Sequence, residues 1–235
     1  MKLTRTVGAA SGAGIAALAV LLLLPTLSAG GDAELAPAAT ATPATAPSPS
    51  TPAAAMLAEL PEPGPAPAAK YDRDLFGQRW ADVDRNGCDT RNDTLTRDLV
   101  DVAFKAGTRE CVVLTGTLHD PYTGETVTFT RISEGYQPVQ IDHIIPLSVA
   151  WSTGAANWTD EKRLRFANDP ANLQATTANQ TKGDRTPSSW LPHEAPAACE
   201  YSTRYIEVAY TYELAIADVD RTALAAALSS CAATP

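Results

Sequence analysis

The hydrophobic and polar positions set the beginning of the chain apart from the rest. Lys2 and Arg5 precede an apolar run from about Val7 to Leu24, and small residues follow it. This order is typical of a secretory signal, and the run also reaches about the length of a short membrane helix. Residues 1–30 are therefore predicted to form a signal peptide or an N-terminal membrane anchor.

The next segment lacks the large apolar residues that a folded core needs. Residues 31–69 consist almost entirely of Ala, Pro, Thr, Ser and Gly, which favours a disordered or polyproline-like linker. Aromatic and aliphatic side chains return at Tyr71 together with charges at ordinary density. A single folded domain is therefore predicted for residues 70–235.

Periodicity within this domain predicts a mixture of helices and strands. Apolar positions at helical spacing, followed by a glycine, predict a helix over residues 94–106. Two β-rich runs at 111–118 and 126–132 flank a Pro- and Gly-containing turn and predict an antiparallel hairpin. A Thr N-cap and early acidic residues predict a helix over 159–167, and the pattern over 196–230 is mostly helical.

Charge and cysteines place limits on function. The net charge of the chain is −9, nearly all of it in the domain, which disfavours bulk electrostatic attraction to nucleic acid. In an exported chain, four cysteines favour two disulfides; a zinc site is the competing reading, but no CxxC pair is present. Three connectivities are open, and sequence proximity favours Cys88–Cys111 with Cys199–Cys231.

Residues 82–93 resemble part of a calcium-binding loop. Asp82, Asp84, Asn86 and Gly87 follow the D-x-D-x-N-G pattern, with Asp93 where such loops end in an acid. The usual terminal Glu is missing, however, and Cys88 follows the glycine directly. A structural turn anchored by a disulfide is the favoured interpretation, and a calcium site is the alternative.

The strongest chemical signal is the sequence that follows Asp142-His143. Hydrolysis of a phosphodiester with one metal needs a base for water and oxygen ligands for the cation, and an Asp-His pair supplies both compactly. The dipeptide alone is weak evidence. Here it opens DHIIPLSVAW, and FANDPANL, NQTKGD and Trp190 follow in order.

These motifs resemble the HNH, or ββα-metal, endonucleases. The similarity is to the branch found in GmrSD-type restriction enzymes and in many exported actinobacterial proteins. It implies an α+β fold in which a ββα-metal core carries an added N-terminal helix and a C-terminal helical segment. Asn179 stands where the family name has its final His, and an amide oxygen suits a hard cation.

The resemblance implies a role for each matching residue. His143 is expected to be the general base, and Asp142 and Asn179 the metal ligands. Asn172 is expected to tie the loop that carries the base to the following element. Lys182 is expected to contact the phosphate or steady the transition state, with a solvated surface lysine as the alternative. The predicted substrate-binding residues are Arg91 and Arg185.

The predicted function is metal-dependent endonucleolytic hydrolysis, most readily of DNA. The expected cofactor is Mg²⁺, with Mn²⁺ as the other candidate, and the expected partner is nucleic acid; no protein partner can be inferred. The expected location is extracellular, either free or tethered through the N-terminus. The competing function is a non-catalytic calcium-binding surface module that uses residues 82–93.

Overall fold

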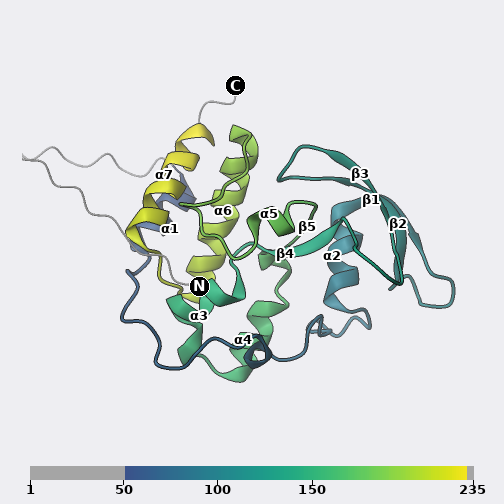
Figure 1. The fold of residues 1–235 in the computed structure, drawn as a ribbon, viewed down its shortest axis with the longest axis horizontal. Helices are drawn as coiled ribbons and strands as arrows, with labels where there is room; N and C mark the ends of the chain where they lie inside the picture. The colour runs from purple at the N-terminus through teal and green to yellow at the C-terminus, as the bar shows by residue number, and fades with distance from the viewer. Residues whose placement is uncertain (1–50, 232–235) are drawn as a thin grey trace, which may run out of the picture. The chain divides into compact units, whose positions relative to one another are not determined.

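The computed structural model describes residues 51–231, and their α+β class agrees with the class expected from the sequence. The described strands form two small antiparallel sheets, β1-β2-β3 and β4-β5 (Figure 1). Their bounds are β1 Leu99–Phe104, β2 Val113–His119, β3 Thr126–Thr130, β4 Gln140–His143 and β5 Leu173–Thr176. The α-helices are α1 Pro52–Glu59, α2 Thr90–Asp98, α3 Leu147–Thr153, α4 Asp160–Ala167, α5 Asn179–Lys182, α6 Ala195–Tyr212 and α7 Asp218–Cys231.

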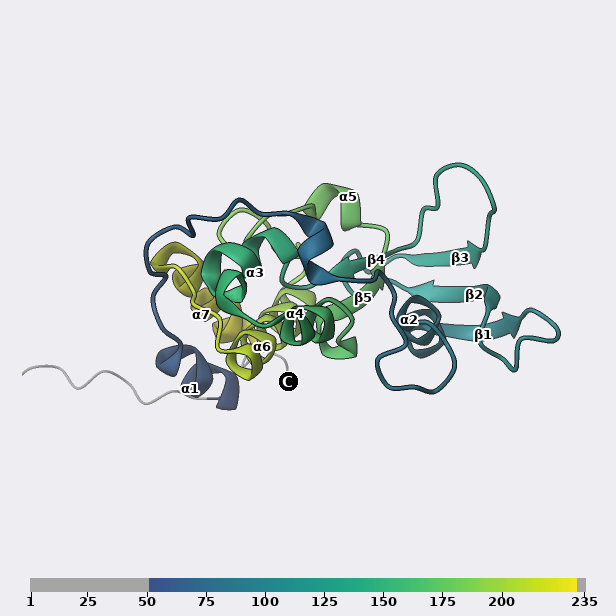
Figure 2. The ribbon, with the colours of Figure 1, turned by 90° about the horizontal axis from the view of Figure 1, so that it is seen from below.

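Three short 3-10 helices complete the framework: η1 Arg73–Phe76, η2 Ala155–Asn157 and η3 Pro170–Asn172. Two groups of buried apolar side chains lie among these elements. The larger group packs among the helices, and the smaller one joins α2 and the three-stranded sheet to the β4-β5 pair. Figure 2 shows the three-stranded sheet at one end of the ribbon and the α6 and α7 helices at the other.

The hairpin predicted at 111–118 and 126–132 is confirmed as β2 and β3. The strands pair in antiparallel register from Thr115 opposite Thr130 to His119 opposite Thr126. The turn between them is closed by Gly124 N–H donating to the Asp120 carbonyl at 2.9 Å. Gly124 has a φ of 73°, a backbone conformation that glycine adopts without strain.

The helix predicted over residues 94–106 is only partly correct. The helix α2 is capped by the Asp89 side chain and ends at Asp98, and Leu99 already has extended backbone angles. From Leu99 the chain continues as β1, which pairs with β2 from Leu99 opposite Leu118 to Phe104 opposite Val113. The apolar positions here fit both helical and strand periods, and pairing with β2, the next strand in the chain, decides between them.

The helices predicted after residue 158 are confirmed, and a disulfide joins the last two of them, α6 and α7. The helix predicted at 159–167 is α4, and its Thr159 cap accepts a hydrogen bond from the Lys162 amide. The helical segment predicted at 196–230 forms α6 and α7. Cys199 is bonded to Cys231, and Cys88 to Cys111, which is the connectivity favoured from sequence proximity.

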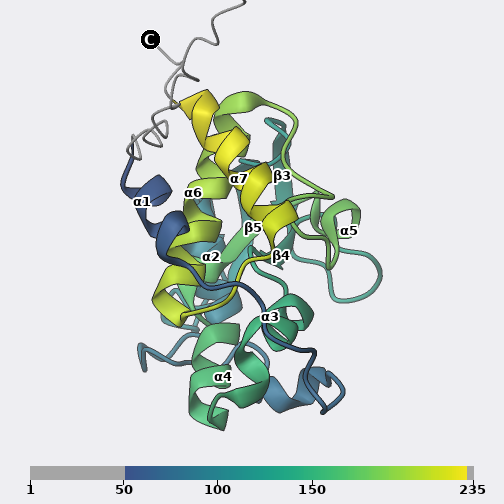
Figure 3. The same cartoon turned by 90° about the vertical axis from the view of Figure 1, so that its left-hand side faces the viewer.

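The linker prediction is wrong for residues 52–60. Thr51 caps α1, Pro52 stands in its first turn, and Leu57 and Leu60 are buried. Figure 3 shows α1 beside α6. The Arg221 guanidinium of α7 donates to the carbonyls of Leu57 and Leu60. A few aliphatic residues in an Ala- and Pro-rich segment are enough for docking because α6 and α7 offer an apolar surface.

The predicted signal or anchor at 1–30, and residues 31–50 of the predicted linker, lie outside the described residues. Among the helices between residues 51 and 231, none combines the length and the hydrophobicity that a membrane crossing requires.

We expect Leu57→Ala to destabilise the domain by about 2–5 kcal/mol, because Leu57 is 4% exposed and its removal leaves a cavity between α1 and the C-terminal helices. Leu75→Ala is the matched control, since Leu75 is 41% exposed, and should cost under about 1 kcal/mol. Urea denaturation followed by circular dichroism measures both. Equal losses would contradict docking of α1 in solution.

Candidate active site

His143 ends β4 with its imidazole held in one orientation. Its Nε2 lies 2.9 Å from the Ala167 carbonyl oxygen. A carbonyl can only accept, so Nε2 carries the proton and Nδ1 is left with a free lone pair in the neutral ring. Burial lowers the pKa of His143 to about 4, with the positive charges of Arg73 and Lys182 contributing, so the ring is neutral at pH 7.

Asp142 lies beside His143 and forms a buried ion pair. The Lys182 Nζ is 3.1 Å from each carboxylate oxygen, and the two residues are 3% and 1% exposed. The Tyr122 hydroxyl donates to Oδ2 at 3.3 Å. Burial raises the pKa of Asp142 to about 6, and the Lys182 ammonium opposes this rise.

The Lys182 side chain is therefore buried in the interior, and its ammonium does not lie at a surface that could face a phosphate. Besides Asp142, its ammonium donates to the His143 carbonyl at 2.8 Å, and its side chain is fully enclosed. These contacts connect the end of α5 to the strand that carries both Asp142 and His143. The geometry favours a positioning role for Lys182 over direct contact with the substrate.

Asn172 fixes the turn that follows His143. Its Oδ1 accepts from the Ile145 amide at 2.8 Å, its Nδ2 donates to the Ile145 carbonyl, and its own carbonyl accepts from the Ile144 amide at 2.8 Å. The side chain is 0% exposed. These bonds connect the turn after His143 to η3, and the functional role expected of Asn172 stays a prediction.

A cavity of about 260 Å³ opens beside these residues and contains Asp142, His143 and Asn179 in its lining. Asn179 donates through Nδ2 to the Gln140 side chain at 2.9 Å, which leaves its amide oxygen available. Asp184 also lines the cavity and was not singled out from the sequence. Two carboxylates and one amide thus line the same cavity, and their oxygens are of the kind that a hard cation prefers.

The remaining lining includes residues that precede the recognised motifs. Tyr71, Arg73 and Trp80 line the same cavity. The sequence showed the aromatic residues of this segment only as anchors at the start of the domain, and it did not indicate Arg73. No local signal identifies them, because they reach His143 only through the packing of η1 against the distant helix α4.

Trp80 connects this segment to His143. Its ring stacks on His143 with 6.5 Å between centroids and 12° between planes. Its φ is 56°, which is strained for a bulky residue and must be maintained by the surroundings. Asn168 supplies part of this restraint, because its side chain accepts from the Ala81 amide and donates to the Gln78 carbonyl.

The two predicted substrate-binding arginines do not line this cavity. The guanidinium of Arg91 lies 6.0 Å from the centroid of the Trp80 ring, so Arg91 approaches the site through Trp80. Arg185 is exposed and donates to the Thr181 carbonyl of its own turn. Their roles in binding substrate stay predictions.

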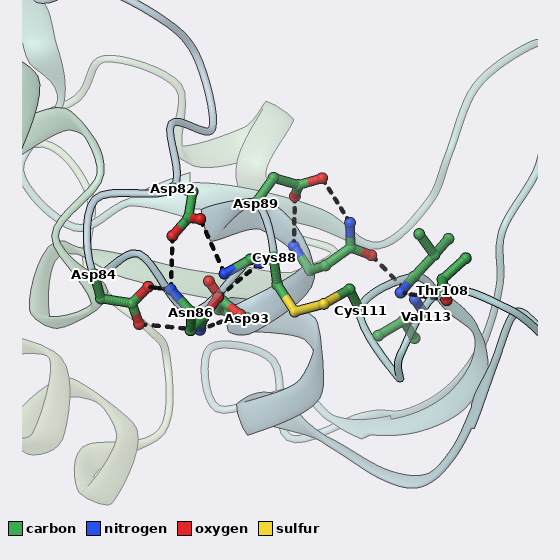
Figure 4. The surroundings of a disulfide bond; sticks show 12 residues. Asp82, Asp84, Asn86, Cys88, Asp89, Asp93, Thr108, Cys111 and Val113 are labelled. Carbon is green, nitrogen blue, oxygen red and sulfur yellow. Dashed lines mark hydrogen bonds between the residues drawn. A yellow bond between two sulfur atoms is a disulfide. The ribbon is translucent and has the colours of Figure 1, made fainter.

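The acidic loop at 82–93 is organised around Asn86 (Figure 4). The Asn86 side chain donates to Asp84 and Asp93, and backbone amides of Asn86 and Gly87 donate to Asp82. The Cys88–Cys111 disulfide anchors the end of the loop. Within residues 51–231 no group of three or more His, Cys, Asp or Glu side chains is arranged to hold a metal. These contacts favour the structural turn.

Comparison with known proteins gives two similarities. Residues 89–227 match the family model of the C-terminal domain of GmrSD restriction endonucleases. The chain is also 37% identical over 169 residues to a protein of Arthroderma benhamiae named "Uncharacterized secreted protein", which covers 70% of this chain and 78% of the other. No solved structure matches the chain.

We expect Lys182→Met to destabilise the domain by about 3–5 kcal/mol, because it leaves the buried Asp142 carboxylate without its cation. The matched control is Lys162→Met. Lys162 pairs at 3.6 Å with an 85% exposed Glu213 side chain, and its loss should cost under about 1 kcal/mol. Chemical denaturation of both variants makes the comparison, and equal losses would mean that the Asp142–Lys182 pair is not formed.

Proposed function

Because the chain belongs to the family of GmrSD restriction endonuclease C-terminal domains, we propose that it is a metal-dependent endonuclease of the HNH type. The observation that carries the proposal is the state of His143, which is neutral, oriented by the Ala167 carbonyl and part of the lining of the cavity. A fixed neutral imidazole beside a carboxylate is the arrangement that activation of water requires.

In this proposal His143 is the general base. Nδ1 takes a proton from the water that attacks the phosphorus, and the hydrogen bond from Nε2 to Ala167 stabilises the imidazolium that forms. Asn172 acts as a positioning residue, because it fixes the backbone immediately after the base. Trp80 restricts the ring from its face.

Asp142 and Asn179 are the proposed metal ligands, with Asp184 as a third oxygen donor. The contacts of Tyr122 and Lys182 with Asp142 leave its carboxylate further acceptor capacity, and the Asn179 amide oxygen is available. Mg²⁺ commonly uses one or two carboxylates and completes its shell with water and substrate phosphate, so this sparse set fits Mg²⁺, or Mn²⁺ in its place. When bound, the cation stabilises charge on the phosphate and the leaving oxygen.

The order of elements supports the HNH assignment. The antiparallel strands β4 and β5 are followed by the short helix α5, and Lys182 of α5 bonds to Asp142 of β4. In the proposed assignment β4, β5 and α5 form the ββα unit, with His143 on its first strand, Asn179 at the start of its helix, and α3 and α4 inserted between the two strands.

The proposed substrate is DNA, and the proposed location is outside the cell. The family of restriction endonuclease domains supports the first, and the relative named as a secreted protein, the two disulfides and the N-terminal apolar run support the second. The calcium-binding alternative has no observation that favours it over the nuclease.

We expect His143→Ala to reduce cleavage of supercoiled plasmid by at least about 10²–10⁴-fold, because a positioned base is lost, and added metal should not restore it. His193→Ala, at an exposed position, is the matched control and should cleave normally. His143→Gln provides a second variant that can still donate to Ala167 if the alanine variant does not fold.

Asn179→Ala should instead weaken metal binding, so that part of the lost cleavage returns at high Mg²⁺ or Mn²⁺ concentration. Plasmid loss against metal concentration, with calorimetric binding of Mn²⁺, separates the two classes of variant. Wild-type cleavage in EDTA, or full activity of His143→Ala in folded protein, would refute the proposed function.

A further inference from the structure

The arginine side chains of this acidic protein differ in whether their guanidinium groups pair with a carboxylate. Among the described residues, Arg97, Arg163 and Arg221 each form an ion pair with a carboxylate. Arg73 and Arg79 form no such pair anywhere between residues 51 and 231. Both belong to the segment that runs past His143, so guanidinium groups without a carboxylate at ion-pair distance among the described residues lie beside this histidine.

These two arginines reach the site from one short stretch of chain. Arg73 lines the 260 Å³ cavity together with Asp142, His143 and Asn179. Arg79 lines a smaller adjoining space that also contains Arg73, Trp80 and His143. Both spaces therefore have Arg73 and His143 in their lining.

We propose that Arg73 binds the phosphate that is cleaved and that Arg79 binds an adjacent phosphate of the same strand; the proposal rests on the nuclease function proposed above. A guanidinium presents two parallel donors that match the two free oxygens of a phosphodiester. The ligand class is therefore a nucleic-acid backbone, recognised by its phosphates and without contribution from base sequence.

The segment holds Arg73 on a restrained frame. Phe76 is 1% exposed and packs against Trp151 and Phe166, with ring centroids 6.3 Å apart in both pairs. The Arg163 guanidinium donates to the Leu75 carbonyl at 2.9 Å, and Trp151 Nε1 donates to the Ala69 carbonyl at 3.0 Å. The backbone on both sides of Arg73 is thus fixed before substrate arrives, which reduces the entropic cost of binding.

The arginines also lie outside the residues that match the family model, which begin at 89. The oxygen donors and the base come from within the matched region, and the phosphate-binding cations come from the segment that precedes it. A net charge of −9 makes such a local source of positive charge necessary for a polyanionic substrate.

The test measures binding apart from cleavage. Full-length protein secreted under oxidising conditions is titrated into a fluorescein-labelled DNA oligonucleotide in EDTA, and anisotropy is followed at several salt concentrations. Arg73→Ala should weaken binding about 10- to 100-fold, as expected for loss of hydrogen bonds to a charged group. The magnitude of the slope of log affinity against log salt concentration should fall by about 1, which corresponds to the loss of one phosphate contact.

Three further variants sharpen the result. Arg73→Lys should recover part of the affinity, since it restores the charge without the paired donors. Arg79→Ala should weaken binding and reduce the salt slope in the same way. Arg109→Ala removes the same charge from an exposed position between β1 and β2 and should leave affinity and cleavage unchanged.

The outcomes separate this proposal from the proposed function. If wild-type protein cleaves DNA with metal but Arg73→Ala binds as tightly as wild type, the arginine assignment is overturned and the nuclease stands. If wild type binds DNA through Arg73 but does not cleave it in the presence of any divalent metal tested, the proposed nuclease function fails and the phosphate-binding site stands. Equal loss of affinity in Arg73→Ala and Arg109→Ala would show that affinity depends on net charge and not on the position of Arg73, which would overturn the proposal.

Discussion

The Lys182 ammonium, enclosed by the Asp142 carboxylate and the His143 carbonyl, is the interaction on which the geometry of the site depends. Removing two charges from water is costly, and mutual attraction offsets that cost only if the partners are held in good geometry. The short helix α5 and the four-residue strand β4 could not fix each other through apolar burial alone. The ion pair connects them, and Asn172 fixes the backbone on the other side of the base.

Around this pair the site assembles contributions with different chemistry from separate parts of the chain. The strand β4 supplies an acid and a base in consecutive residues, and the bend after it, tied by Asn172, follows directly. Residues 179–184 add an amide and a second carboxylate, and residues 71–80 add guanidinium and indole groups. The cavity therefore combines oxygen donors from one part of the chain with guanidinium groups from another.

The sequence predicted the parts of this arrangement whose signal lies within a short stretch of residues. The Thr159 cap, the hairpin turn and the Asp142-His143 motif each carry their signal within a few residues. The change from α2 to β1 at Leu99 did not, because β1 exists through pairing with β2. Docking of α1 and the approach of Arg73 to His143 likewise depend on surfaces formed by residues far away in sequence. Burial of Lys182 could not be read from a lysine in a Gly-Asp turn.

The docking of α1 also affects when the domain can become complete. The bond from Arg221 to the Leu57 carbonyl joins residues 164 positions apart, and the α6–α7 disulfide includes Cys231. Contacts of such high sequence separation pay loop-closure entropy before they contribute stability, which slows folding. The first described helix therefore cannot complete its contacts until α7 has been synthesised. A nascent chain without α7 lacks part of the surface that receives α1. Full docking of α1 is therefore expected late in the folding of each newly made chain.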